Sequence, residues 1–216
     1  MAHHSQQTLS AISREAQARL GTANAAREEA YPLTRQIIHL CASAIRATHR
    51  QEYDQSRSLL QQATILLNQV RIAVKDHPAL YHSGYVTDAQ KEYAEAWAVL
   101  AFLSGTPLSG PGELGVETAS YLNGLAEAAS ELRRSILDAL RRNDMSHCEQ
   151  WMVTMDDVYS LLVTMDFPEA ITGGLRRTTD QLRGVLERTR GDLTMALRQH
   201  ALERKLAEFQ ERVNNV

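Results

Sequence analysis

The residues with the clearest chemical potential are two pairs of glutamates at helical spacing. The first pair, Glu92 and Glu95, stands three positions apart at the head of the apolar run 96–103. Because a helix that is apolar on every side is buried, we expect these two carboxylates to enter the protein interior with it. Buried carboxylates need a compensating cation, since burying unpaired charge is costly.

The second pair, Glu127 and Glu131, stands four positions apart on the polar side of the segment 115–142. Residues at i and i+4 share one face of a helix. Two helices that each offer two carboxylates would supply the hard oxygen ligands that Mg²⁺ prefers, with Mn²⁺ as the alternative ion. The spacing alone sets neither whether the two pairs meet in space nor whether they hold one ion or two.

Two other interpretations compete with a divalent-ion site. Glutamates at this spacing more often form a solvated face or salt bridges. A di-iron carboxylate centre normally contains the motif Glu-x-x-His twice, and this motif is absent from the sequence. We therefore set the di-iron alternative aside and retain the divalent-ion site and the solvated face.

A basic strip within residues 33–50 is the candidate contact for nucleic acid. It comprises Arg35, Arg46, His49 and Arg50. Each cation that binds a phosphate releases counterions, which makes the affinity depend on salt. A strip of this kind is equally well explained as a solvated helix face.

The elements that must position these residues are helices, because the 3.6-residue period of apolar side chains runs through the whole chain. We predict an all-α, single-domain bundle of about seven helices, at residues 5–29, 33–49, 52–74, 88–103, 115–142, 146–165 and 172–212. Pro32 restarts or kinks the first of them, and Asp88 and Thr172 are the predicted N-caps of the fourth and the seventh. The last helix would span about 60 Å, so we expect part of it to pack against another subunit.

Length and composition exclude several classes of protein. The 216 residues are 44% hydrophobic, which is enough for a sizeable core. A formal net charge of −3 argues against a uniformly basic nucleic-acid binder. The two cysteines, Cys41 and Cys148, indicate reduced thiols in a cytoplasmic protein. The sequence has no run of about 18 apolar residues, so we expect no membrane contact.

Five segments resemble the translin family and occur in the order found there: residues 27–30 (REEA), 44–50 (AIRATHR), 76–78 (DHP), 90–96 (QKEYAEA) and 121–133 (YLNGLAEAASELR). The resemblance extends over roughly residues 27–205. It is closer to the nuclease subunit, translin-associated factor X (Trax), and its prokaryotic relatives than to translin. Lys91 is an additional residue relative to the Trax segment QEYVEA, and Glu127 replaces the aspartate of the Trax segment DLTGEL.

The resemblance implies an N-terminal helical extension at residues 1–26 and a translin-like helical domain at residues 27–216. It implies a hollow, closed homo-oligomer, commonly an octamer, that binds single-stranded RNA or single-stranded DNA. Trax-like members cut RNA with Mg²⁺ at acidic residues that face the interior, which assigns Glu92, Glu95, Glu127 and Glu131 as metal ligands and catalytic residues. A non-catalytic binder of single-stranded nucleic acid, of the translin type, is the alternative, and a purely structural helical scaffold is the third hypothesis.

Overall fold

The computed structural model describes residues 2–214, and all regular secondary structure within this range is helical, which confirms the all-α fold class. Met1, Asn215 and Val216, which belong to the expected ranges 1–26 and 27–216, lie outside the described residues. Residues 2–214 form six long helices and three single-turn helices: α1 (Ala2–His49), α2 (Tyr53–Val74), α3 (Pro78–Tyr81), α4 (Gly84–Ser104), α5 (Pro111–Leu114), α6 (Thr118–Arg141), α7 (Cys148–Val163), α8 (Glu169–Thr172) and α9 (Leu175–Asn214).

The first helix continues through Pro32, so the two helices expected at 5–29 and 33–49 are one helix, α1. A proline inside a helix removes one backbone hydrogen bond and crowds the preceding turn. The helix persists because side chains on both sides of the proline are fully buried in the same core, among them Ala30, Ile37 and Cys41. Tertiary packing therefore outweighs the local cost of Pro32.

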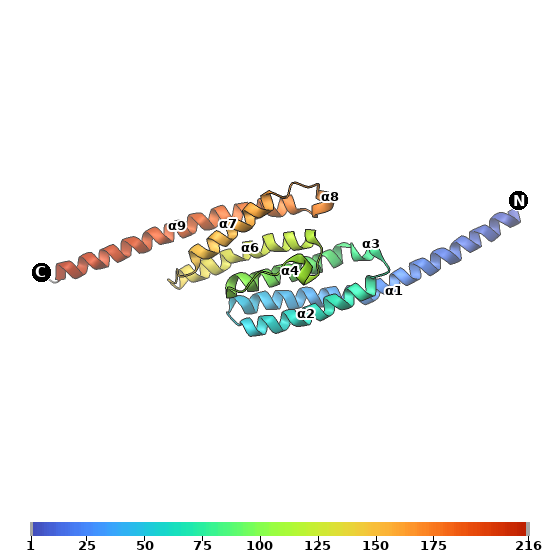
Figure 1. Ribbon diagram of the computed structural model, residues 1–216, viewed down its shortest axis with the longest axis horizontal. Coiled ribbons are helices and arrows are strands. Elements are labelled where there is room, and N and C mark those ends of the chain that lie inside the picture. The colour runs from blue at the N-terminus through green and yellow to red at the C-terminus, as the bar shows by residue number, and fades with distance from the viewer. Residues whose placement is uncertain (1, 215–216) are drawn as a thin grey trace.

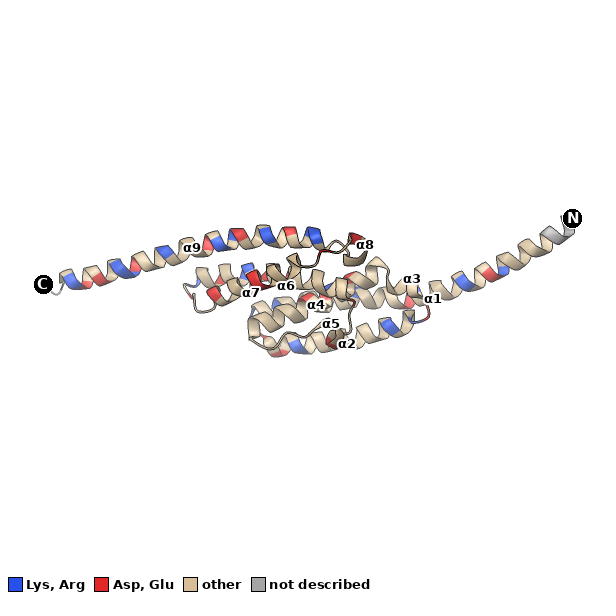
Figure 2. Cartoon of the chain, turned by 45° about the horizontal axis from the view of Figure 1, so that its top comes forward, with Lys and Arg blue, Asp and Glu red and all other residues tan. Residues whose placement is uncertain are grey.

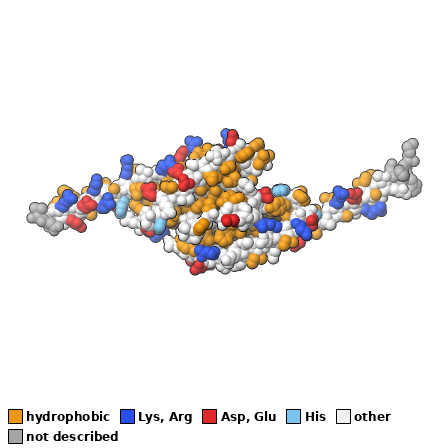
Figure 3. Space-filling view, in the orientation of Figure 1, with side chains coloured by type: hydrophobic (Ala, Val, Ile, Leu, Met, Phe, Trp, Pro, Cys, Tyr) orange, Lys and Arg blue, Asp and Glu red, His pale blue; other side chains and the backbone are white. Residues whose placement is uncertain are grey.

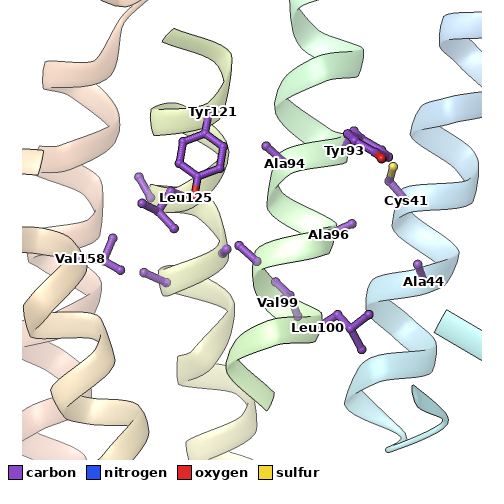
Figure 4. Packing of buried hydrophobic residues seen from close by; sticks show 14 of the residues in the cluster. Cys41, Ala44, Tyr93, Ala94, Ala96, Val99, Leu100, Tyr121, Leu125 and Val158 are labelled. Carbon is purple, nitrogen blue, oxygen red and sulfur yellow. The ribbon is translucent and has the colours of Figure 1, made fainter. Parts of the chain in front are cut away.

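The central element of the bundle is α4, which lies between α1 and α6 (Figures 1 and 4). Ala96 points toward α1, whereas Ala94 points toward α6, as Figure 4 shows. The run 96–103 is buried or half-buried at every position, as its all-round hydrophobicity predicts. Helix α2 packs against α1 on one side of this layer, and α7 and α9 pack against α6 on the other.

Two helix starts differ from the predicted ones. Helix α4 begins at Gly84, with Ser83 as its N-cap, so Asp88 lies within the helix rather than at its start. Thr172 is the last residue of the short helix α8, not the cap of the long one. Between α8 and α9, Gly173 and Gly174 have φ angles of +59° and +85°. Glycine adopts this left-handed conformation more readily than any other residue, so the chain can turn here before α9 begins.

Both terminal helices extend beyond the bundle at opposite ends (Figure 1). Basic and acidic residues alternate along the projecting part of α9 (Figure 2). Exposed apolar side chains occur on both projections: Leu9, Ile12 and Leu20 on α1, and Leu202, Leu206, Phe209 and Val213 on α9. Hydrophobic side chains also gather over the centre of the face shown in Figure 3. Among the described residues, none of the helices combines the length and the hydrophobicity that a membrane span requires.

Candidate metal centre

The site is built where α6 crosses close to α4, and Gly124 is the residue that permits this approach. A Cβ atom at Gly124 would lie 2.5 Å from the carbonyl oxygen of Lys91 and 2.9 Å from the backbone nitrogen of Glu95. Real Cβ atoms do not approach other atoms this closely, so any side chain at this position would separate the helices. Glu127, one turn further along α6, is thereby brought beside the carboxylates of α4. An isolated glycine inside a helical pattern was the available sequence signal.

Three of the four glutamates singled out in the sequence converge. One carboxylate oxygen from each of Glu92, Glu95 and Glu127 lies within 4.8 Å of the other two. Glu92 and Glu95 come from successive turns of α4, and Glu127 comes from α6. We call this group the carboxylate cluster. Its oxygen atoms are of the type that Mg²⁺, Mn²⁺ or Ca²⁺ accepts.

The carboxylate cluster holds more negative charge than its surroundings neutralise. Glu95 is only 8% exposed, and burial, followed by the charges of Glu92, Glu127 and Glu131, raises its pKa to about 9. Burial also raises the pKa of Glu92, although the nearby ammonium of Lys91 works in the opposite direction. Carboxylates in such surroundings are stabilised by a cation, either a proton or a metal ion.

Lys91 is the cation that contacts the cluster. Its Nζ atom lies 2.9 Å from the carboxylate of Glu127 and 3.5 Å from Oε1 of Glu92. Burial disfavours the charged ammonium, but the hydrogen bond to Glu127 and the neighbouring negative charges outweigh this effect and raise the pKa of Lys91. In the sequence, Lys91 is distinguished only as an additional residue relative to the Trax segment QEYVEA. The packing of α4 against α6 places the Lys91 ammonium beside Glu127.

Glu131, the fourth glutamate, lies outside the cluster and is held by His49. Nε2 of His49 donates a 2.8 Å hydrogen bond to Oε2 of Glu131, and this bond is the main reason why the pKa of Glu131 is lowered. The His49 side chain is 4% exposed, and its Nδ1 faces the hydroxyl of Ser135 at 3.1 Å. His49 is therefore a buried partner of Glu131 and not part of an exposed basic strip.

The other three members of the basic strip are exposed, with different degrees of pairing. Arg50 donates two hydrogen bonds to Glu52, at 3.0 and 2.7 Å, and Arg46 donates one to Ser43. Arg35 forms no ion pair within the described part of the chain and lines an apolar pocket of about 580 Å³ between α1 and α2. A role in binding nucleic acid stays a prediction for these arginines.

A polar groove of about 780 Å³ lies beside the carboxylate cluster, and we call it the α4/α6/α9 groove. Lys91 and Glu127 line it together with Asn123 and with Arg177 of α9. Its volume is in the range of clefts that hold ligands. The groove provides a route by which a polar molecule reaches Glu127 from solvent.

Comparisons with known proteins point to one group of structures. No protein-family model matches the chain. The chain is 32% identical to AfC3PO, covering 86% of this chain and 96% of that one, with TM-scores of 0.79 for AfC3PO and 0.80 for its complex with duplex RNA. The crystal structure of apo-NeC3PO has a TM-score of 0.73 over 87% of this chain and 96% of that one, at 20% identity, which shows the fold alone. An uncharacterized protein of Methanocaldococcus jannaschii is 28% identical over 193 residues, which make up 88% of this chain and 85% of that protein.

Proposed function

Because the chain belongs to the translin family, which includes the C3PO proteins, we propose that it is a Mg²⁺-dependent endoribonuclease. The observation that carries this proposal is the convergence of Glu92, Glu95 and Glu127 from two helices onto one point. Lys91 pairs with Glu127 and lies near Glu92, but the Glu95 carboxylate has no such partner among the described residues, so salt bridges alone do not account for the convergence. The buried position of Glu95 argues further against a solvated face.

The residues of the cluster fit a divalent ion. All three offer hard carboxylate oxygens, and Glu95 receives no hydrogen bond from any residue that the structure describes. Oxygens bound to one Mg²⁺ lie at most about 4.2 Å apart. The observed separation of up to 4.8 Å is close to this limit, so small side-chain rotations suffice to complete the ligand set.

Each residue has a role in hydrolysing a phosphodiester. Glu92, Glu95 and Glu127 hold the ion, with Mn²⁺ as the alternative to Mg²⁺. A divalent ion bound there supplies charge neutralisation on the phosphate and an activated water. We propose that Glu131, which is held by His49, orients the attacking water.

The partners in this proposal are RNA and further copies of the chain. The structure of AfC3PO with duplex RNA supports RNA as the ligand, and single-stranded RNA is the proposed substrate. The exposed apolar side chains on both projecting helices support assembly, since surfaces of this kind mark contacts between proteins. We propose a closed homo-oligomer of eight subunits, with the carboxylate cluster facing its interior.

The test compares RNA cleavage by the wild-type protein and by two near-isosteric variants, Glu95→Gln and Glu127→Gln. Labelled single-stranded and duplex RNA oligomers are incubated with Mg²⁺, with Mn²⁺ or with a chelator, and light scattering gives the mass of the assembly. We expect cleavage only with a divalent ion, and a loss of at least about 100-fold in both variants. Glu187→Gln, which removes an exposed carboxylate paired with Arg183, is the matched control and should cleave like the wild type. Cleavage at the wild-type rate by Glu95→Gln would overturn the proposal.

A non-catalytic nucleic-acid binder is the second candidate function. The RNA complex of AfC3PO and the exposed arginines of α1 favour it. Tight binding of RNA without cleavage in the presence of either ion would select it. A protein that binds no RNA and whose melting temperature RNA leaves unchanged would instead be a structural scaffold.

A further inference from the structure

The position of Lys91 inside the carboxylate cluster leads to an inference that rests on the proposed function. We propose that Lys91 is a phosphate-binding residue that exchanges partners. Its ammonium neutralises Glu127 and Glu92 when no divalent ion is bound. It moves into the α4/α6/α9 groove and contacts an RNA phosphate when the ion and the RNA are bound.

Lys91 is the sole cationic partner of the cluster in the described part of the chain. No other lysine, arginine or histidine there forms an ion pair with Glu92, Glu95 or Glu127. The contacts to Glu127 at 2.9 Å and to Glu92 at 3.5 Å place a positive charge where a metal ion would otherwise neutralise the same oxygens. The ammonium of Lys91 therefore neutralises part of the negative charge that a bound divalent ion would neutralise.

An ammonium and a divalent ion cannot both occupy this position. Charges of equal sign a few ångströms apart repel strongly in a partly buried site. Lysine has a flexible four-carbon stem, so its charge can move by several ångströms without any change in the backbone. The side chain of Lys91 is 25% exposed and lines the groove, so its ammonium can rotate away from the carboxylates into the groove.

The charges that line the α4/α6/α9 groove favour a contact between the released Lys91 ammonium and an RNA phosphate. Its walls carry the acidic residues Asp88, Glu117 and Glu169 in addition to Glu127, and Arg177 is the other permanent cation that lines it. An RNA strand that enters this groove meets more negative than positive side chains. A mobile cation beside the reacting phosphate offsets this repulsion, and cations placed there also stabilise the charge that develops during phosphoryl transfer.

Removing the positive charge of Lys91 should strengthen metal binding but slow RNA cleavage. A purely structural role of Lys91 would not produce these opposite effects. In Lys91→Met, an apolar chain of similar length replaces the ammonium. We expect the dissociation constant for Mn²⁺, measured by calorimetry without RNA, to fall about tenfold because the competing cation is gone. At saturating metal, kcat for RNA cleavage should nevertheless fall about 100-fold, because the phosphate contact is lost.

Three further variants complete the experiment. Lys75→Met removes the same charge from the exposed end of α2 and should change neither quantity. Lys91→Arg keeps the positive charge and should retain most of the cleavage activity. Lys91→Gln repeats the neutralisation with a polar side chain, and circular dichroism and melting temperature show that each variant is folded.

Distinct results would overturn the inference. An Mn²⁺ affinity that does not rise in Lys91→Met and Lys91→Gln would exclude the exchange. Tighter metal binding together with undiminished cleavage at saturating metal would mean that Lys91 is only a counterion and does not contact phosphate. A wild-type protein that binds no divalent ion would overturn the proposed function itself and this inference with it.

Discussion

Glu131, in the middle of α6, accepts a 2.8 Å hydrogen bond from Nε2 of His49, the last residue of α1. The two residues are 82 positions apart, so the contact ties the end of the first helix to the segment that carries Glu127. The ring of His49 is enclosed, and the hydroxyl of Ser135 faces its other nitrogen. The orientation of Glu131 relative to the carboxylate cluster is therefore fixed by a residue outside both glutamate pairs.

Replacing this carboxylate should lower stability in a way that depends on pH. The folded protein lowers the pKa of Glu131, so its contribution to stability is present above the ordinary pKa of a glutamate and is lost as the pH falls through the lowered value. Glu131→Gln should reduce the free energy of unfolding at pH 7 by about 0.5–1 kcal/mol, a small value because the carboxylate is partly exposed. Urea unfolding at neutral and acidic pH measures the difference, which should shrink in acid. A constant difference at all pH values would contradict the role of the charge.

Glu95→Gln should stabilise the metal-free protein while it removes metal binding. The pKa of Glu95 is raised to about 9, so the unfolded chain favours the charged form more than the folded protein does, and stability is lost as the pH rises above the ordinary glutamate value. A neutral amide avoids this cost, and we expect a gain of about 1–3 kcal/mol at pH 7 in the absence of metal. Chemical denaturation with a chelator present measures it. Equal or lower stability in the variant would show that burying the Glu95 carboxylate does not reduce the free energy of unfolding.

Metal binding should release a proton at neutral pH. Glu95 binds a proton below pH 9 and has to lose it before its carboxylate binds an ion. The affinity for Mn²⁺ should therefore increase as the pH rises toward 9, by up to about tenfold per pH unit. Calorimetry in buffers of different ionisation enthalpy should detect about one released proton per ion at pH 7. Binding enthalpies that do not vary with the buffer would contradict this expectation.

A methyl group at Gly124 should disrupt both the fold and the metal site. The added Cβ would meet the backbone of α4 at Lys91 and Glu95, so Gly124→Ala has to separate α6 from α4. We expect a loss of about 1–3 kcal/mol of stability and much weaker Mn²⁺ binding. Gly191→Ala is the matched control, because no atom lies within 4 Å of a Cβ placed there on the exposed face of α9. That change should stabilise the protein by about 0.5–1 kcal/mol through helix propensity alone.

Arg46 in α1 and Arg50, the residue that follows α1, should differ in their contribution to RNA binding. Arg46 forms a single hydrogen bond to a hydroxyl, whereas the guanidinium of Arg50 already pairs with Glu52. Arg46→Ala should reduce the salt dependence of RNA affinity by about one unit of slope, and Arg50→Ala should have a smaller effect. Fluorescence anisotropy over a range of salt concentrations measures the slopes. Arg198→Ala on the projecting end of α9 is the control, and a larger effect there than at Arg46 would move the RNA contact away from α1.

The sequence by itself determined the helices, the buried run of α4 and the presence of two glutamate pairs. These features depend on neighbouring residues, because the 3.6-residue period and the i, i+3 and i, i+4 spacings are local properties of one helix. Local signals were less reliable at helix ends. Asp88 and Thr172 are favourable capping residues, yet α4 and α9 begin elsewhere, and α1 continues through Pro32 because the core holds both of its halves.

The tertiary structure decided which side chains meet. Glu127 joins Glu92 and Glu95, Lys91 enters their cluster, and His49 turns away from the arginines of α1 to bind Glu131. Each contact depends on the distance and rotation between helices that are far apart in sequence. That geometry is set by close packing at a few positions, above all at Gly124, and the period of a single helix does not contain it.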